Sequence, residues 1–127
     1  LDTMPQECLV ELTVRYQPGT QACGVLVRAS DDLEQYYQLR LEPSRQRLVF
    51  DRWPRPGDQA FMIERPLPLC AGQPITLRIL VDGTNVVAYA NDRLALSCRM
   101  YQHREGKLGL FATEGEATFM SVTMKTR

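Results

Sequence analysis

Three adjacent residues, Asp51, Arg52 and Trp53, carry the side chains best equipped for ligand recognition in this sequence. Carboxylate and guanidinium groups form multidentate hydrogen bonds with hydroxyl groups, and an indole ring packs against the apolar face of a sugar ring. Residues 53–58 (WPRPGD) include two prolines and a glycine. This composition excludes a central strand and predicts an exposed loop. We therefore expect the three side chains to form a carbohydrate-binding site at the mouth of that loop.

Three further charged residues are candidates for the same site. We expect Glu64 to return beside Asp51, because the residues between them can form a hairpin. Arg40 and Arg78 each alternate with apolar neighbours, so both are expected to face outward and to line the same sheet face. A structural interpretation stays open: Asp51 and Arg52 would form an ion pair that caps a strand, while Trp53 would cover a hydrophobic edge or dock on another domain.

The sequence contains few candidate catalytic residues. The single histidine, His103, lies in the turn-like run 102–106 (QHREG) without a nucleophile nearby in the sequence. We interpret it as a solvated loop residue rather than a general base. The sequence also contains no Gly-x-Ser-x-Gly motif, phosphate-binding loop or dinucleotide fingerprint. We therefore predict no catalytic residue and no cofactor.

Four cysteines occur at widely separated positions: Cys8, Cys23, Cys70 and Cys98. None belongs to a Cys-x-x-Cys pair, so we predict no zinc or other metal site. Cys8 and Cys98 fall in alternating apolar rows, and we interpret them as small buried hydrophobic residues. The even number of cysteines leaves disulfides open, whereas free core thiols fit a reducing compartment, which favours a cytoplasmic parent protein and leaves an extracellular one open.

Length and charge indicate one neutral domain. The chain has 127 residues with 15 basic and 15 acidic side chains, so we predict a single domain over residues 1–127 and neither a nucleic-acid nor an anionic-membrane partner. No apolar run approaches the roughly 20 residues that span a bilayer. The sequence begins without methionine, and we expect it to be a piece of a longer protein.

Alternation of apolar and polar residues is the clearest structural pattern, and it is strongest in residues 76–101. Leu77, Ile79 and Val81 share one face of a strand. The pairs Asp82-Gly83 and Asn91-Asp92 are turn signals that join three alternating runs into an antiparallel meander. The chain holds about ten such runs and no helical periodicity. We therefore predict an all-β fold, an antiparallel two-sheet β-sandwich.

The same meander resembles the closing strands of the C-terminal β-sandwich of glycoside hydrolase family 32, which includes invertases, levanases and inulinases. The matching segments are 77–82, 86–92 and 99–101 in the meander and 24–30, 36–41 and 48–52 upstream. The last of these ends in the Asp51-Arg52 pair, which the family shows after a hydrophobic strand. Val87 departs from the family pattern, because glutamate is common at that position.

The resemblance implies a sandwich of jelly-roll or concanavalin-like topology that is accessory to a catalytic β-propeller in the same polypeptide. Some of these sandwiches are classed as carbohydrate-binding module family 66, which binds the terminal fructose of fructans, and the Asp-Arg pair belongs to the binding region. The family's nucleophile motif, Asn-Asp-Pro-Asn, is missing. Since glycoside hydrolysis needs two flanking carboxylates, we expect no hydrolysis by the isolated chain and a β-fructosidase-type parent.

Two functions from different classes follow. The first is a noncatalytic module that binds a fructose-containing carbohydrate such as levan, inulin or a sucrose-type sugar. The second is a structural sandwich that stabilises the catalytic β-propeller or mediates dimerisation without binding sugar. A more distant alternative is a lectin-like sandwich that binds another glycan or a protein, since one fold supports many sites.

Overall fold

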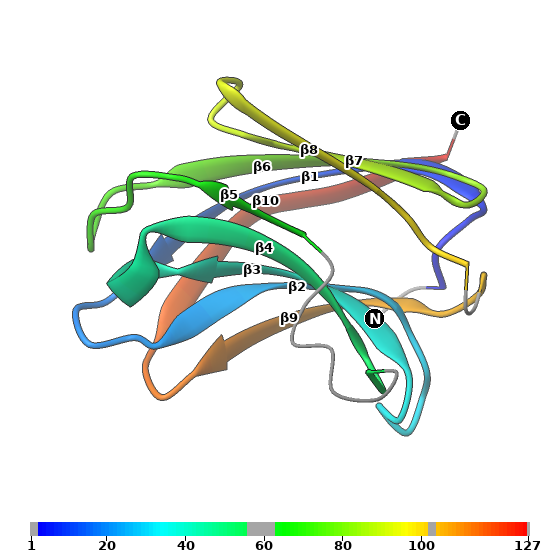
Figure 1. Ribbon diagram of the computed structural model, residues 1–127, viewed down its shortest axis with the longest axis horizontal. Coiled ribbons are helices and arrows are strands. Elements are labelled where there is room, and N and C mark those ends of the chain that lie inside the picture. The colour runs from blue at the N-terminus through cyan, green and yellow to red at the C-terminus, as the bar shows by residue number, and fades with distance from the viewer. Residues whose placement is uncertain (1–2, 56–62, 102–103, 127) are drawn as a thin grey trace.

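The computed structural model describes residues 3–55, 63–101 and 104–126, which form two antiparallel five-stranded sheets stacked face to face (Figure 1). Sheet A contains, in spatial order, β5 (Ile63–Pro66), β4 (Arg47–Trp53), β3 (Tyr36–Glu42), β2 (Ala22–Ala29) and β9 (Lys107–Thr113). Sheet B contains β10 (Ala117–Thr126), β1 (Glu7–Tyr16), β6 (Ile75–Asp82), β7 (Asn85–Ala90) and β8 (Leu94–Arg99). The predicted all-β, two-sheet sandwich is therefore confirmed.

Helical structure in the described part of the chain is limited to one 3-10 turn, η1 (Pro43–Arg45), which connects β3 to β4. The described residues include no helix that is long and apolar enough to cross a membrane. The turn ends at Gln46, whose φ of 51° lies in the left-handed region. The chain therefore reverses direction directly after η1, and Arg45 lies at the turn of the β3–β4 hairpin.

The predicted meander corresponds to β6, β7 and β8 in sheet B. Gly83 has a φ of 60° in the β6–β7 turn, a conformation that glycine adopts without steric cost. Asn91 and Asp92 each have a φ of 54° between β7 and β8, which short polar side chains tolerate better than others. Both predicted turns are therefore confirmed.

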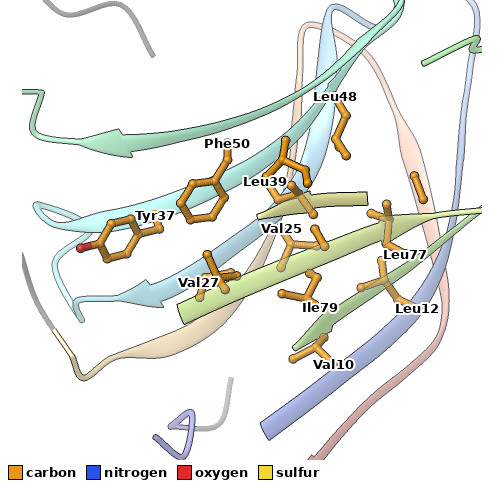
Figure 2. Packing of buried hydrophobic residues seen from close by; sticks show 14 of the residues in the cluster. Val10, Leu12, Val25, Val27, Tyr37, Leu39, Leu48, Phe50, Leu77 and Ile79 are labelled. Carbon is orange, nitrogen blue, oxygen red and sulfur yellow. The ribbon is translucent and has the colours of Figure 1, made fainter. Parts of the chain in front are cut away.

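The core lies between the sheets and uses every second residue of the central strands. In β6 the burial pattern alternates strictly, so Ile75, Leu77, Ile79 and Val81 are buried and their neighbours are exposed. Figure 2 shows buried side chains of the two sheets meeting across the sandwich. Those labelled include Val10, Leu12, Leu77 and Ile79 from sheet B, and Val25, Val27, Leu39 and Leu48 from sheet A. Because the inner faces are used for packing, a ligand can reach only the outer faces and the strand ends.

Strand register determines which polar side chains share the outer face of sheet A. Directly opposed residues of an antiparallel pair project from the same side of the sheet. Gln38 is opposite Asp51 and Glu42 is opposite Arg47 in the β3–β4 pair. Val49 of β4 is opposite Arg40 on one side and Glu64 on the other. The outer face of sheet A therefore carries charged residues from three neighbouring strands.

The four cysteines are free, but they differ in burial. Cys8 and Cys23 are buried, and burial raises the pKa of the Cys23 thiol to about 11. Cys70 is exposed, whereas Cys98 is half-buried. The interpretation of Cys98 as a small buried residue is therefore only partly right, because β8 is an edge strand of sheet B and nothing in the described residues continues the sheet beyond it.

Candidate functional site

Asp51 lies at the centre of a charged cluster on the outer face of sheet A and is only 3% exposed. Arg40 Nη1 donates to Oδ2 at 2.8 Å, Arg55 Nε donates to Oδ1 at 3.2 Å, and the Arg52 backbone N–H donates to Oδ1 at 2.8 Å. A second Arg55 nitrogen, Nη2, also donates to Oδ2. Burial alone would raise the pKa of Asp51, but the hydrogen bonds from Arg55, Arg40 and the Arg52 backbone outweigh it, so the pKa lies below its usual value.

The cluster extends across three strands as a continuous chain of ion pairs. Arg40 also pairs with Glu42 through Nε, and Glu42 pairs with Arg47, which reaches Glu64 on β5. Arg40 Nη1 additionally donates to the Gln38 side-chain oxygen at 2.7 Å. For Glu42, burial would raise the pKa, but hydrogen bonds from Arg47 and Arg40 and the charges of both hold it below its usual value.

A pocket of about 470 Å³ opens on this face beside the ion pairs, and its volume is within the range of small-molecule sites. We call it the arginine pocket. Its lining includes four arginines and one aromatic ring: Arg40, Arg45, Arg47, Arg55 and Phe111, together with Gln21, Ala22, Gln38, Glu42, Ser44 and Thr113. The arrangement offers charged hydrogen-bond donors on one side and an apolar ring surface on the other.

Small residues on β2 explain why there is a hollow at this place. Gly24 is opposite Arg40 on β3 and Phe111 on β9, so all three share the outer face. A Cβ atom on Gly24 would lie 2.0 Å from the Leu39 carbonyl oxygen, and only glycine permits this close approach of the backbones. With Ala22 as the next outward residue on β2, little side-chain volume fills the space between Arg40 and Phe111.

The predicted triplet of Asp51, Arg52 and Trp53 does not itself form an open site. The crevice at this end of β4 has a volume of only about 30 Å³, which is roughly the space of one water molecule. Asp51 and Trp53 occur two residues apart and share the outer face, and Trp53 is 46% exposed. Arg52 is opposite the buried Tyr37, which places it on the core-facing side of β4.

The remaining predicted residues divide between the two sheets. Arg40 and Glu64 belong to the ion-pair chain around Asp51, and the predicted hairpin return of Glu64 is confirmed by the pairing of β4 with β5. Arg78 is on β6 in sheet B, 3.4 Å from Glu11 and over the Tyr89 ring. The expectation that Arg40 and Arg78 line one sheet face is therefore wrong, because β6 pairs with β1 and β7.

The structural interpretation expected an ion pair between Asp51 and Arg52, but the partners of Asp51 are other arginines. Asp51 does form ion pairs, but they join it to Arg40 and Arg55, and the Arg52 guanidinium makes none within the described residues. Sequence reasoning missed Arg45, Arg47, Arg55 and Phe111. Arg55 carried a signal, since it follows Asp51 closely in the predicted loop, whereas Phe111 carried none, because only the pairing of β2 with β9 brings it to the site.

In residues 3–55, 63–101 and 104–126, no group of three or more His, Cys, Asp or Glu side chains is arranged to hold a metal ion. His103, interpreted from sequence as a solvated loop residue, lies outside the described residues.

A second hollow, of about 500 Å³, is on the outer face of sheet B and has an apolar character. Leu9, Leu80 and Val87 are directly opposed across β1, β6 and β7 and all line it. Lys125 and Asn85 are among the polar residues at its margin. Leu80 is 41% exposed, so this face presents an apolar row to the exterior.

Comparisons with known proteins identify similar folds and a matching sequence family. No curated protein matches the sequence. The structure is similar to carbohydrate-binding module CBM66 from Bacillus subtilis, with a TM-score of 0.87 and 19% identity over 98% of this chain and 78% of that one. It is also similar to a fructosyltransferase from A. japonicus, with a TM-score of 0.76 and 19% identity over 99% of this chain. An exo-inulinase from Aspergillus awamori matches with a TM-score of 0.69 and 16% identity over 98% of this chain.

These likenesses establish a shared fold, and the chain spans only 24% and 26% of the two enzymes' lengths. The family itself is established by sequence. The family "Glycosyl hydrolases family 32 C terminal" matches residues 2–126, so the chain belongs to this family, as the resemblance of its strands predicted.

Proposed function

We propose that this chain is a noncatalytic carbohydrate-binding domain that recognises a fructose-containing sugar in the arginine pocket. The observation that carries the proposal is the pocket itself, because four arginines and Phe111 line a hollow of about 470 Å³ on the outer face of sheet A. Membership of the family 32 C-terminal domains and the likeness to module CBM66 support a sugar as the ligand class.

The chemistry of the pocket suits a small hydroxylated ring. Guanidinium groups donate paired hydrogen bonds to ring and hydroxyl oxygens, and Phe111 offers an apolar surface for the C–H face of the sugar. Arg40 is held by Asp51, Glu42 and Gln38 before any ligand arrives, so little ordering entropy is lost when it binds. The pocket takes one or two sugar units, and we expect weak affinity, on the order of millimolar, for a single unit.

Isothermal titration with fructose, sucrose, levan and inulin tests the proposal directly. We expect binding of at least one of these sugars, and we expect Phe111→Ala to weaken it by about fivefold to tenfold through loss of the stacked ring. Tyr89→Ala is the matched control, since Tyr89 is a half-buried aromatic residue on the outer face of sheet B. Both variants need unfolding curves to verify that they fold. No heat from any of the four sugars at tens of millimolar would contradict the proposal.

The identity of the parent protein is part of the proposal. We infer that the domain accompanies a catalytic β-propeller of the β-fructosidase type, because the fructosyltransferase and exo-inulinase contain this fold within longer chains. Sequencing the adjoining coding region tests this inference. A propeller-type catalytic domain immediately upstream is the expected result, and any other class of neighbour would contradict it.

A second candidate function rests on the apolar hollow of sheet B. The row of Leu9, Leu80 and Val87 is suited to packing against another protein surface, and the catalytic domain of the same polypeptide is the partner that the family implies. In the parent protein, we expect Leu80→Asn to make the two domains unfold less cooperatively. Arg78→Gln, on the same strand, is the surface control and should not change the cooperativity. Identical melting profiles for the two variants would exclude this role for the hollow.

A further inference from the structure

The side-chain oxygens of Glu42, Gln38 and Asp51, beside the arginine pocket, already accept hydrogen bonds within the protein. Both oxygens of Glu42 accept hydrogen bonds, one from Arg40 and one from Arg47. The Gln38 side-chain oxygen accepts from Arg40, which leaves the amide NH₂ of Gln38 as the group that can turn to a ligand. Both oxygens of Asp51 are also occupied. The carboxylates beside the pocket are therefore committed to the arginines, and the remaining side-chain oxygens of the lining are the neutral ones of Gln21, Ser44 and Thr113.

Donors, by contrast, remain in excess. A guanidinium carries five N–H donors and no acceptor. Arg40 uses Nε and Nη1 within the protein, and Arg55 uses Nε and Nη2. Arg45 is exposed at the end of η1, lines the pocket, and has no hydrogen-bond or ion-pair partner among the described residues. The arginines of the pocket therefore keep charged N–H donors for a ligand, and Arg45 offers a whole guanidinium.

The balance of charges around the pocket also favours a negatively charged ligand group. The four arginines of the pocket lie among three carboxylates, Glu42, Asp51 and Glu64, and the ion pairs account for Arg40, Arg47 and Arg55. Among the described residues, Arg45 is the positive charge of this set that has no carboxylate partner. A neutral sugar hydroxyl can accept hydrogen bonds from these donors, but it brings no negative charge to offset that of Arg45. A ligand group with several acceptor oxygens and a negative charge satisfies the donors more completely.

We propose that the arginine pocket selects a sugar that carries an oxyanion, a phosphate or a carboxylate, with Arg45 as the residue that binds this group. This inference rests on the proposed function, since the sugar ring is placed against Phe111 in the same pocket. Arg45 enters from the β3–β4 turn and Phe111 from β9 on the far side of β2. The ligand would extend across β3 and β2 between these two groups.

Calorimetric titration of the whole chain with fructose, fructose 6-phosphate, galacturonate and inorganic phosphate tests the proposal, at low salt and at physiological salt. We expect at least one of the two charged sugars to bind about tenfold more tightly than fructose at low salt, which is the gain typical of one charge-assisted hydrogen-bonding group. The gain should shrink at higher salt, because exposed charges are screened. Fructose 6-phosphate and galacturonate distinguish a phosphate from a carboxylate as the oxyanion.

The variant Arg45→Gln tests whether Arg45 produces the preference for a charged sugar. It should reduce the ratio of charged-sugar affinity to fructose affinity to within about twofold, and both affinities are measured on the variant. Arg93→Gln is the matched control, because Arg93 is also an exposed arginine in a turn, between β7 and β8 of sheet B, with no side-chain partner in the described residues. It should retain the full preference.

The outcomes separate this inference from the proposed function. Binding of fructose or levan without any gain from a charged group overturns the inference and leaves the proposed function standing. A gain that persists in Arg45→Gln, or inorganic phosphate that binds as tightly as fructose 6-phosphate, also overturns it. A charged sugar that binds while neutral sugars and inorganic phosphate give no heat supports the inference and contradicts a neutral fructan as the ligand. Silence from every sugar contradicts both.

Discussion

Replacing Asp51 with asparagine removes the charge that holds Arg40 and Arg55 together. Asp51 and Arg40 have side chains that are 4% and 12% exposed, whereas Arg55 is 39% exposed and can turn toward water. Breaking a buried pair costs about 3–5 kcal/mol and an exposed pair about 0–1 kcal/mol. Because Arg40 keeps Glu42 as a partner, we expect Asp51→Asn to lower the free energy of unfolding by about 2–3 kcal/mol.

Urea unfolding followed by tryptophan fluorescence measures this change. For an m-value of about 2 kcal/mol per molar urea, the midpoint should fall by roughly 1–1.5 M. Asp92→Asn is the matched control, since Asp92 is 72% exposed and lies 3.6 Å from Arg78. Its effect should stay below about 0.5 kcal/mol. Equal midpoint shifts for the two variants would refute the reasoning.

Acid titration gives an independent reading of the same cluster. The pKa values of Asp51 and Glu42 are lowered in the folded chain, so their stabilisation is present above the unfolded-state pKa values, about 4, and is lost as the pH falls through the folded-state values. The wild-type chain should therefore lose stability more steeply than Asp51→Asn below about pH 4. Parallel pH profiles for the two proteins would contradict a stabilising role for the ionised carboxylate.

Two further predictions follow from close approach and burial. Gly24→Ala should lower the free energy of unfolding by about 2 kcal/mol or more, because the new Cβ would lie 2.0 Å from the Leu39 carbonyl oxygen; an unchanged melting temperature would contradict the geometry of β2 and β3. In the folded chain, a thiol reagent at pH 8 should modify the exposed Cys70 rapidly and leave Cys23 unmodified until unfolding, because Cys23 is buried and its pKa is raised to about 11. Similar labelling rates for the two thiols would show that the Cys23 environment is open.

The strands and turns were predictable because they depend on local pattern. Alternation along β6 gave the buried row of Leu77, Ile79 and Val81, and the turn pairs at Gly83 and Asn91 fixed the order of the meander. These features use only neighbouring residues, so no knowledge of distant strands was needed. The family resemblance rests on the same segments and is confirmed.

The site was predictable only in part, because it depends on which strands are neighbours. Alternation shows that Arg40 and Arg78 face outward from their own strands, but it does not say that β3 and β6 belong to different sheets. Phe111 reaches the pocket only through the long-range pairing of β9 with β2. Arg52 is a different case, since adjacent strand residues point to opposite faces, and this rule already separates it from Asp51 and Trp53.

Amide chemical-shift mapping of the ¹⁵N-labelled chain during titration with short levan oligosaccharides tests the central claim most directly. The account predicts shifts that concentrate on the outer face of sheet A, around Arg40 on β3 and Phe111 on β9, where these residues line one pocket. Shifts confined to sheet B around Leu80, or a spectrum that does not change with added sugar, would contradict it.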